Sequence, residues 1–493
     1  MFETLIHDHA ATAPEDTAFR TPTGPTVTYA TVALDVRRCA AWLAQQGVAP
    51  GMRAMLQVDD PYLHWVLFLA LDMHGVVSIG DMATAPLNPA LVDGLGASLV
   101  FSSIPNQAFA KARTFLIDGE WIGSMRACDA APLSDRSLHD DDPVCIVFSS
   151  GTTGAPKKVL LTRGMIDRRT LHAREAGFLR PGARIACLLP FQSIGGILAV
   201  FQAWLVGGSI CWPSHALNWS KAIAVGAFDT WVAAPIHLER ILSILPQDFR
   251  RPDGLVILAG GGALSRPLAA ALRQRLTDEI VVAYGSTEMG LVTKATIDQI
   301  TGAEESAGPI LPWMQVEVID EVGNACPSGK SGELRVRGDD VVTGYFEDEA
   351  ETARYFRDGW YHPGDVGHID SAGILTVSGR VDELINIGGR KAVPAAIEAV
   401  ALQLPGVADV AAFAAPFSGE TQLWVAYATD RALPPATFAP LLRYFPAVRI
   451  APMDALPRNA MGKVERRALA AKAAEGSLAS ELVVPEMAET EAS

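Results

Sequence analysis

Apolar residues along the chain recur in short blocks whose spacing predicts alternating strands and helices. The block Met52–Val58 predicts a buried strand, Tyr62–His74 a helix and Gly75–Ile79 a second strand. Upstream of them, the spacing of apolar residues in 32–43 predicts an amphipathic helix that ends at Gly47. Such an alternation is typical of layered α/β proteins, in which helices cover the faces of a sheet.

The alternation continues through most of the chain and changes character near residue 332. Residues 333–338 alternate between apolar and polar with a period of two, and residues 396–450 alternate helix and strand in a small α+β pattern. Further apolar blocks that predict buried strands lie at 144–148, 159–161, 185–189, 255–258 and 281–283. We therefore expect an α/β protein with a large N-terminal domain of layered α/β subdomains and a small α+β C-terminal domain.

Composition narrows the class of protein. A chain of 493 residues suggests two or three domains, and its formal net charge of −15 disfavours nucleic-acid binding. The six cysteines are scattered without a CxxC pair, which argues against a zinc site and for a reducing compartment. No run of about 18 uninterrupted apolar residues predicts a membrane span, and the N-terminus lacks the pattern of a signal peptide. We expect a cytoplasmic protein.

Candidate chemistry begins in the polar stretch between two of the predicted strands, residues 149–158. It combines hydroxyl side chains, two glycines and two lysines: Ser149, Ser150, Gly151, Thr152, Thr153, Gly154, Lys157 and Lys158. Glycines let backbone N–H groups face a ligand, hydroxyls donate hydrogen bonds and lysines offset anionic charge. A plain exposed hairpin loop would not need this combination, so the pattern favours a loop that binds a polyphosphate.

Two common nucleotide-binding patterns do not fit the chain. A Walker loop needs Gly-Lys-Ser/Thr at the start of a helix, whereas Gly154 is followed by Ala-Pro-Lys and then by a predicted strand. The glycines of 260–262 follow a predicted strand, but the dinucleotide-binding pattern would need a glycine where Ser265 stands. A different kind of nucleotide site is therefore indicated.

A second polar element follows the strand that ends near Ala283. Tyr284 could stack on a base, Thr287 could bond a phosphate, and Glu288 could hold Mg²⁺, which prefers oxygen ligands and often bridges substrate phosphates. Farther along, Asp365 ends a Trp-Tyr-His-Pro-Gly-Asp stretch, which by itself would be an ordinary turn.

Six elements along the chain, taken together, resemble the signatures of the acyl-adenylate-forming superfamily. Three of them are the loop at 149–158, the element with Tyr284 and Glu288, and the stretch that ends at Asp365. That superfamily contains acyl-CoA synthetases, adenylation domains of peptide synthetases and luciferases, and the pattern here is closest to acyl- or aryl-CoA ligases. The remaining elements are the glycine-rich turn, the stretch Gly379–Gly389, which resembles the hinge motif, and Leu456–Arg467, which resembles the C-terminal lysine motif. The likeness extends over about residues 20–470.

The resemblance implies a role for each matching residue. Lys463, Thr287 and Glu288 would be catalytic, with Glu288 also binding the metal ion. Nucleotide binding would fall to Ser149, Ser150, Gly151, Thr152, Thr153, Gly154, Lys157, Gly261, Gly262, Tyr284, Gly285, Asp365 and Arg380. The acyl pocket would include Gln192, Ser193, Gly260, Met289 and Gly290, and the thiol channel Gly388 and Gly389.

The resemblance also sets the expected domain boundaries. Asp382 falls at the pivot position, so the large adenylation domain would cover 1–381 and the small lid domain 382–472. The small domain would rotate about Asp382 between the two half-reactions. Residues 473–493 contain five Glu and no Lys or Arg, so we expect an acidic, disordered tail.

The chain departs from the superfamily's pattern at several positions. Lys158 replaces the last glycine of the loop, and Ser193 stands where a histidine is usual at the gate of the acyl pocket. Further departures are Pro363, Asn386 and Asn459. The segment around Gln192 lacks an aspartate that would anchor an α-amino group, which disfavours an amino-acid substrate. Few charges in the candidate pocket segments favour an apolar aliphatic or aromatic acid.

The implied activity is ATP- and Mg²⁺-dependent conversion of a carboxylic acid to acyl-AMP, followed by transfer to a thiol, most simply CoA. A second hypothesis is a stand-alone adenylating enzyme that loads the phosphopantetheine of an acyl or peptidyl carrier protein, or forms an amide. No carrier-like segment follows Lys463, so the carrier would act in trans. The third is a nucleotide-binding homologue without catalysis, which the departures leave open.

Overall fold

The computed structural model describes most of the chain, and its contacts divide it into two compact units. The first consists of residues 1–302, 308–315 and 336–361, and the second of 303–307, 316–335 and 362–493. The residues outside the description are 1, 21–25, 82–84, 134–135, 150–156, 214–226, 248, 250–252, 302–305, 388–389, 430, 432, 459–463 and 485–493. The hinge expected at Asp382 concerns rotation of the small C-terminal domain between two positions, so it stays a prediction.

One sheet of the first unit has the strand order β6-β5-β3-β4-β7-β8, parallel except for the β7–β8 pair. Its strands are β3 (Arg53–Gln57), β4 (Val77–Gly80), β5 (Leu99–Ser102), β6 (Arg113–Leu116), β7 (Pro143–Ser149) and β8 (Lys157–Thr162). The helices between and after them are α2 (Tyr29–Gln45), α3 (Pro61–Met73), α4 (Pro89–Gly94), α5 (Gly119–Arg126) and α6 (Arg163–Glu175). The predicted strand–helix–strand order of residues 52–79 is thus confirmed.

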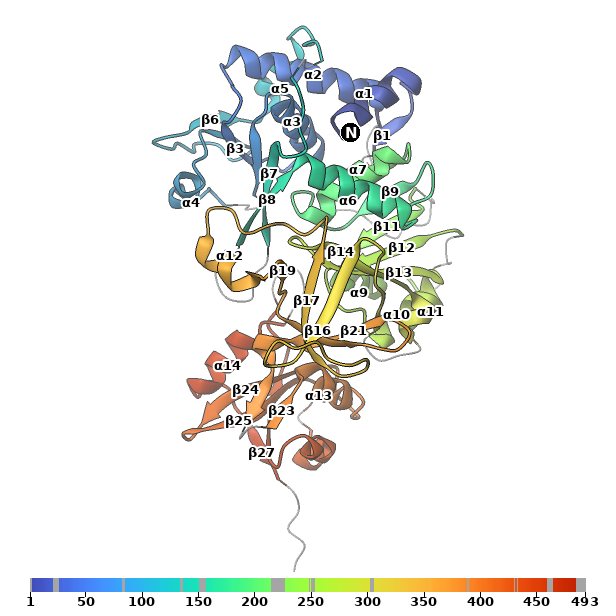
Figure 1. The fold of residues 1–493 in the computed structure, drawn as a ribbon, viewed down its shortest axis with the longest axis vertical. Coiled ribbons are helices and arrows are strands. Elements are labelled where there is room, and N and C mark those ends of the chain that lie inside the picture. Colours follow the sequence, from blue (N-terminus) through green and yellow to red (C-terminus); the bar gives the residue numbers. More distant parts are fainter. Residues whose placement is uncertain are drawn as a thin grey trace, which may run out of the picture. The chain divides into compact units, whose positions relative to one another are not determined.

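A second sheet of the same unit has the order β14-β13-β12-β11-β9-β10-β1-β2. Its strands are β1 (Thr17–Phe19), β2 (Val27–Thr28), β9 (Arg184–Cys187), β10 (Ser209–Cys211), β11 (Thr230–Ala233), β12 (Val256–Gly260), β13 (Glu279–Ser286) and β14 (Gly290–Thr296). The associated helices are α1 (Phe2–Thr12), α7 (Ile194–Leu205), α9 (Pro235–Ile244), α10 (Arg266–Arg275) and α11 (Ile297–Thr301). Figure 1 shows both sheets with their helices.

Helices α3 and α7 form the centre of this unit's core. From Leu63 onward every residue of α3 is buried, as expected of a helix that is apolar on all sides. The ring centre of Trp65 on α3 lies 5.5 Å from that of Phe201 and 6.1 Å from that of Trp204, both on α7. The apolar run that follows Pro190 in the sequence is therefore a core helix. None of the helices described is long and apolar enough to cross a membrane.

The first unit also includes α12 (Glu349–Tyr355), β18 (Phe356–Arg357) and β19 (Trp360–Tyr361). Strands β15 (Ser306–Pro309), β16 (Met314–Ile319) and β17 (Gly332–Gly338) each have residues in both units. The segment before α12 carries Tyr345, whose ring packs edge-on against Tyr355 and Phe356. This small aromatic group brings residues 345–356 together.

The second unit ends in the small α+β pattern that the sequence predicts. Its elements are β20 (Asp365–Ile369), β21 (Ile374–Arg380), the 3-10 turn η1 (Val381–Glu383), β22 (Ile385–Ile387), β23 (Arg390–Ala392), α13 (Pro394–Ala401), β24 (Asp409–Phe417), β25 (Glu420–Ala428), η2 (Pro435–Arg443), β26 (Val448–Met453), α14 (Arg466–Ala474) and β27 (Glu481–Val483). The sheet β24-β25-β26-β27 packs one face against α13 and η2 and the other against α14.

The prediction of a disordered tail from residue 473 was wrong for its first part. Helix α14 continues to Ala474, and Glu481–Val483 form β27, which pairs antiparallel with β26. The acidic composition misled the prediction, because Val483 is buried among the apolar side chains of the small sheet. Only residues 485–493 of the tail lie outside the described part.

Candidate active site

The predicted polyphosphate loop connects the two strands of a hairpin. β7 and β8 pair antiparallel, and Ser149 lies opposite Lys157 in the register. A Walker loop would open a helix instead, so the strand–loop–strand prediction is confirmed. Several predicted site residues lie outside the described part of the chain: Ser150, Gly151, Thr152, Thr153, Gly154, Gly388, Gly389 and Lys463.

Lys157 turns its side chain into a buried cluster. Its Nζ lies 2.9 Å from Oε2 of Glu351 and 3.2 Å from the centre of the Tyr355 ring, and the side chain is 8% exposed. The hydrogen bond from the lysine lowers the pKa of the Glu351 carboxyl. A carboxylate and an aromatic face therefore hold this lysine, and its contact with a phosphate stays a prediction.

Glycines shape the turn that carries Glu288, which joins β13 to β14. A Cβ on Gly285 would come within 2.2 Å of the carbonyl oxygen of Gly290, so only glycine fits there. Gly290 itself has a φ of +67°, a left-handed conformation that glycine adopts at little cost. Between them, Thr287 and Glu288 are both buried, at 9% and 5% exposure. The glycines of this motif thus allow the tight reversal that turns a carboxylate inward.

Glu288 is held through its main chain and its side chain. The Val342 amide donates a hydrogen bond of 2.8 Å to the Glu288 carbonyl oxygen. The Tyr345 hydroxyl donates one of 3.2 Å to Oε1 of the Glu288 carboxylate. The ring of Tyr345 also lies 4.8 Å from Nζ of Lys157, so one tyrosine contacts both predicted site residues.

Arg169 supports the same turn from α6. One guanidinium nitrogen donates a 3.0 Å hydrogen bond to the Thr287 carbonyl oxygen, and the other donates to the Asp340 carbonyl oxygen at 2.5 Å. Burial lowers the pKa of Arg169 to about 10, so the group stays charged at neutral pH, and Asp340 and Glu288 supply the opposite charge. The Asp340 carboxylate is in turn 2.8 Å from Nδ1 of His172.

This donor set fits a metal ion that arrives with a phosphate substrate. Within the described ranges, no group of three or more His, Cys, Asp or Glu residues could hold a metal ion alone. Mg²⁺ usually binds proteins through one or two carboxylates, with substrate phosphates and waters as its other ligands. Glu288, a single buried carboxylate with one oxygen engaged by Tyr345, suits such a site.

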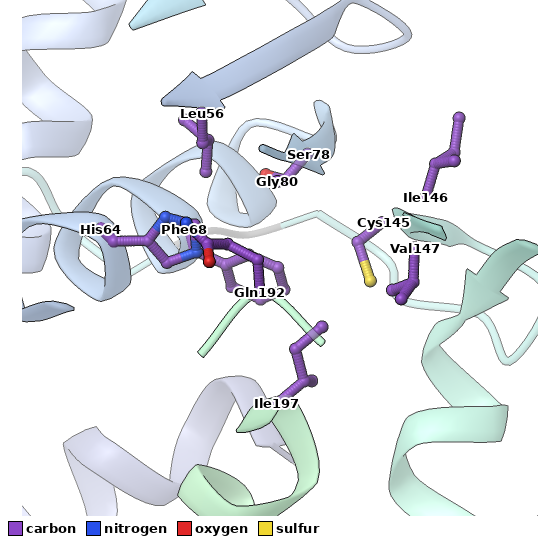
Figure 2. A pocket seen from close by; sticks show the side chains of 10 residues that line it. All are labelled: Leu56, His64, Phe68, Ser78, Gly80, Cys145, Ile146, Val147, Gln192 and Ile197. Carbon is purple, nitrogen blue, oxygen red and sulfur yellow. The ribbon is translucent and has the colours of Figure 1, made fainter. Parts of the chain in front are cut away.

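Gln192 lines a small cavity next to β7, whereas the other predicted acyl-pocket residues do not line it. The cavity is bounded by Leu56, His64, Phe68, Ser78, Gly80, Cys145, Ile146, Val147, Gln192 and Ile197, and Figure 2 shows these side chains. Ser193 instead caps α7, since its Oγ accepts a hydrogen bond from the Gly196 amide at 3.2 Å. Of the others, Met289 is buried at 1% exposure beside the Glu288 turn, and Gly260 ends β12.

The glycine-rich turn and Tyr284 lie on neighbouring strands of the second sheet. β12 ends at Gly260, and Gly261 has a φ of +80°, which explains a glycine at that position. Gly260 pairs with Ala283, the residue before Tyr284, in the parallel register of β12 and β13. The ends of β12 and β13, which lead into the predicted adenine-contacting elements, are therefore neighbours in the sheet, and Gly262 follows in the turn after β12.

The second unit brings Asp365, Arg380 and Asp382 together. Asp365 begins β20 and lies opposite Arg380 at the end of β21. The Arg380 guanidinium forms ion pairs with Oδ1 of Asp365 at 3.2 Å and Oδ1 of Asp382 at 3.3 Å, and donates to the Pro363 carbonyl oxygen at 3.0 Å. Arg467 contacts the other oxygen of Asp382 at 3.3 Å. The predicted hinge residue is thus held by two arginines in this structure.

Sequence reasoning missed the residues that support Glu288. Tyr345 stands in a Thr-Gly-Tyr stretch that carried no assigned role, and Asp340 precedes it in a turn. Arg169 lies on an ordinary-looking helix, 118 residues before the carbonyl group that it binds. No local pattern could have linked these positions, because their relation arises only when α6 packs beside β14.

A comparison with protein families covers the part of the chain that carries the hairpin and the Glu288 turn. Residues 6–346 match the sequence profile of the AMP-binding enzyme family, and this range covers more than half of the chain. The chain belongs to that family. Within this AMP-binding enzyme, the matched range includes the hairpin loop, the Glu288 turn and Tyr345.

Full-length relatives of this AMP-binding enzyme are CoA ligases by name. A 4-coumarate–CoA ligase 2 of Nicotiana tabacum is 27% identical over 500 residues, covering 91% of this chain and 90% of its own. An indoleacetate–CoA ligase of Aromatoleum aromaticum is 27% identical over 493 residues, covering 94% and 96%. Both relatives therefore match this chain over most of its length.

Solved structures share the fold of this AMP-binding enzyme. The ATP-bound MatB of Rhodopseudomonas palustris superposes with a TM-score of 0.84 at 22% identity, over 96% of this chain and 99% of that one. O-succinylbenzoate coenzyme A synthetase (MenE) of Bacillus subtilis, in complex with ATP and magnesium ion, gives 0.81 at 23% identity, over 94% and 98%. The predicted fold class, a large N-terminal and a small C-terminal α/β part, is therefore confirmed.

Proposed function

We propose that this AMP-binding enzyme is an AMP-forming acyl- or aryl-CoA ligase. It uses ATP, Mg²⁺ and CoA to convert a carboxylic acid into its CoA thioester. In the first half-reaction, a carboxylate oxygen of the acid attacks the α-phosphorus of ATP, and the bond to the β-phosphate breaks. Acyl-AMP forms and pyrophosphate leaves. In the second, the CoA sulfur attacks the acyl carbonyl carbon, and AMP leaves.

The observation that carries the proposal is the position of Glu288. A buried carboxylate, fixed by Val342, Tyr345 and the Arg169-bound turn, is what a site for magnesium-bound phosphates requires. Catalysis of this kind depends mostly on holding the reacting groups in place and stabilising charge. Glu288 would hold Mg²⁺, which would offset the charge of the phosphates. Thr287 would contact the α-phosphate.

The remaining predicted residues have separate parts in this proposal. The hairpin loop from Ser149 to Lys157 would bind the pyrophosphate part of ATP. Asp365 would accept hydrogen bonds from the ribose, and Arg380, already paired with it at 3.2 Å, would keep the carboxylate oriented. Lys463 would place the acid's carboxylate against the α-phosphate, because a lysine ammonium is a compact cation.

ATP–pyrophosphate exchange with a panel of carboxylic acids tests the first half-reaction. We expect at least one aliphatic or aromatic acid to support exchange, and the variant Lys463→Ala to abolish it while the fold remains. Exchange at near wild-type rate in Lys463→Ala would contradict its role. Lys472→Ala, a lysine in the last turn of α14, is the matched control.

The acceptor is tested by supplying CoA or a phosphopantetheinylated carrier protein with the acids that support exchange. We expect acyl-CoA, because the full-length relatives are CoA ligases. Thioester formed only on the carrier would favour the second hypothesis, a carrier-loading enzyme. Binding of ATP without exchange for any acid would favour a homologue that lacks catalysis.

We also propose that the protein acts in the cytoplasm, since its cysteines are all free thiols.

A further inference from the structure

A small cavity in the first unit is lined by two buried polar side chains, each with one polar atom that lacks a hydrogen-bond partner. His64 on α3 and Gln192 before α7 both line it, at 2% and 8% exposure. Nδ1 of His64 and Oε1 of Gln192 are buried and have no partner. An unsatisfied polar atom in a protein interior is costly and calls for an explanation. The two side chains that carry these atoms line the same cavity (Figure 2).

The hydrogen-bonding character of both groups can be read from their surroundings. Nε2 of Gln192 donates to the Asp81 carbonyl oxygen at 3.3 Å, which fixes the amide so that Oε1 is left as an acceptor. Burial lowers the pKa of His64 from 6.5 to about 3, so its imidazole is neutral at neutral pH and can both donate and accept. No Lys or Arg is among the residues that line the cavity. The cavity therefore suits a neutral group and not an anion.

The cavity lies where an open parallel sheet commonly binds ligands, at the carboxyl ends of its strands. Leu56 is next to last in β3, Gly80 is last in β4, and Val147 lies near the end of β7; the three strands are parallel. A Cβ on Gly80 would come within 2.5 Å of the Gln192 Cβ, so glycine is what lets Gln192 reach under the strand end.

The cavity and the proposed phosphate loop lie along the same strand, β7. Cys145, Val147 and Ser149 alternate along β7 and so share one of its faces. Cys145 and Val147 line the cavity, and Ser149 begins the loop. At about 3.3 Å per residue, Cys145 lies about 13 Å from Ser149, roughly the length of an extended medium-chain acid.

We propose that this cavity receives a hydroxyl group at the far end of the acid substrate. The hydroxyl would donate to Oε1 of Gln192 and accept from the His64 imidazole N–H, which satisfies both unpartnered atoms. The cavity has room for about one water molecule, so a single terminal hydroxyl fits and a second carboxylate does not. This inference rests on the proposed ligase function and specifies its substrate class: hydroxylated, monocarboxylic acids.

Matched pairs of acids test the inference on the wild-type enzyme. The pairs are 4-hydroxybenzoate and benzoate, 4-coumarate and cinnamate, and 8-hydroxyoctanoate and octanoate, compared by kcat/KM in ATP–pyrophosphate exchange. In at least one pair we expect the hydroxylated acid to be preferred by about tenfold or more, because the acid without the hydroxyl leaves buried polar atoms unpaired. No preference in any pair would overturn the inference and identify the cavity as a site for a resident water only.

The variants Gln192→Leu and His64→Phe then test which residues read the hydroxyl. Each should lower the preference, measured as the ratio of the two kcat/KM values, by about tenfold. Gln202→Leu, on α7 but outside this cavity, should leave the ratio unchanged. A preference that survives both cavity variants would overturn the inference. If one variant does not fold, the other decides.

Failure of the proposed function would look different. If no acid in the panel supports exchange in the wild-type enzyme, the ligase function and the inference resting on it both fail. If acids without a hydroxyl support exchange as well as the hydroxylated ones, the ligase function stands and only the inference is wrong.

Discussion

Two polar regions of the first unit, the Glu288 turn and the cavity at His64 and Gln192, differ in the hydrogen-bond partners of their central side chains. Around Glu288, the side chain and the neighbouring carbonyl groups have partners supplied by Tyr345, Val342 and Arg169. In the cavity, one atom of each polar side chain has none.

This difference fits the role proposed for each region. Partners fixed in the protein hold a carboxylate in one position before any substrate arrives, which is how a charge-stabilising site works. Unpartnered groups cost stability in the free enzyme and gain from a ligand that completes them. Removing a polar group should therefore lower the free energy of unfolding strongly at the Glu288 turn. In the cavity it should lower it only slightly, or even raise it.

Loss of Arg169 should have the largest effect. The variant Arg169→Met leaves the Thr287 and Asp340 carbonyl oxygens unpaired and the buried carboxylates of Glu288 and Asp340 without their cation. We expect a loss of about 3 kcal/mol or more in the free energy of unfolding, measured by urea denaturation.

The neighbouring residue provides the control for that experiment. Arg168→Met removes an arginine whose guanidinium makes a more exposed contact with the Asp339 carbonyl oxygen at 3.2 Å. It should change the free energy of unfolding by about 0.5 kcal/mol or less. Equal losses in the two variants would show that the Glu288 turn does not depend on Arg169.

Glu288→Gln should leave the fold in place and impair the chemistry. The amide keeps the shape of the side chain but removes the negative charge proposed to hold Mg²⁺, so we expect kcat/KM for exchange to fall about a hundredfold. Glu279→Gln, at the start of the same strand β13, is the matched control. A Mg²⁺ titration that is unchanged in Glu288→Gln would contradict the assignment.

Tyr345→Phe should have an intermediate effect. The ring remains to pack against Lys157, Tyr355 and Phe356, but the hydrogen bond to Oε1 of Glu288 is lost. We expect the Mg²⁺ concentration for half-maximal exchange to rise about tenfold, since a hydrogen bond to a charged group contributes about 1.5–3 kcal/mol.

Tyr355→Phe is the control for Tyr345→Phe, because it also removes a hydroxyl from the aromatic cluster while its ring keeps the contact with Lys157. Thermal stabilisation of each variant by Mg²⁺ and ATP gives a second readout that does not depend on turnover. A similar Mg²⁺ response in both variants would mean that Tyr345 does not position Glu288.

His64→Phe should have the smallest effect on stability. Unlike the other variants, it should protect the protein, by removing a loss of stability in mild acid. Because burial lowers the pKa of His64 to about 3, the unfolded chain binds the proton first as pH falls below 6.5. The wild type should therefore lose about 1 kcal/mol of stability between pH 6.5 and 5.5 through this group, and the variant should not. Urea midpoints at the two pH values measure it; equal acid losses would mean that His64 does not carry the proton uptake.

Hydrophobic periodicity was enough to predict the layered α/β fold, including the strands that flank the proposed phosphate loop. Short motifs were enough to single out Glu288, Asp365 and Arg380 as candidate site residues, but only the structure places Glu288 on the turn between β13 and β14 and Asp365 opposite Arg380. Those same motifs could not identify Tyr345, Arg169 or the cavity. His64 stands inside an apolar run and reads as a core position until the packing shows an unpartnered ring nitrogen.

Strand β27 has a practical consequence for handling the protein. It covers one edge of β26, whose Val448 and Ile450 are buried, and thereby keeps that edge from pairing with another molecule. A shortened version ending at the predicted domain limit of residue 472 would leave β26 as an open edge and invite self-association. An affinity tag placed after residue 484 keeps the sheet closed.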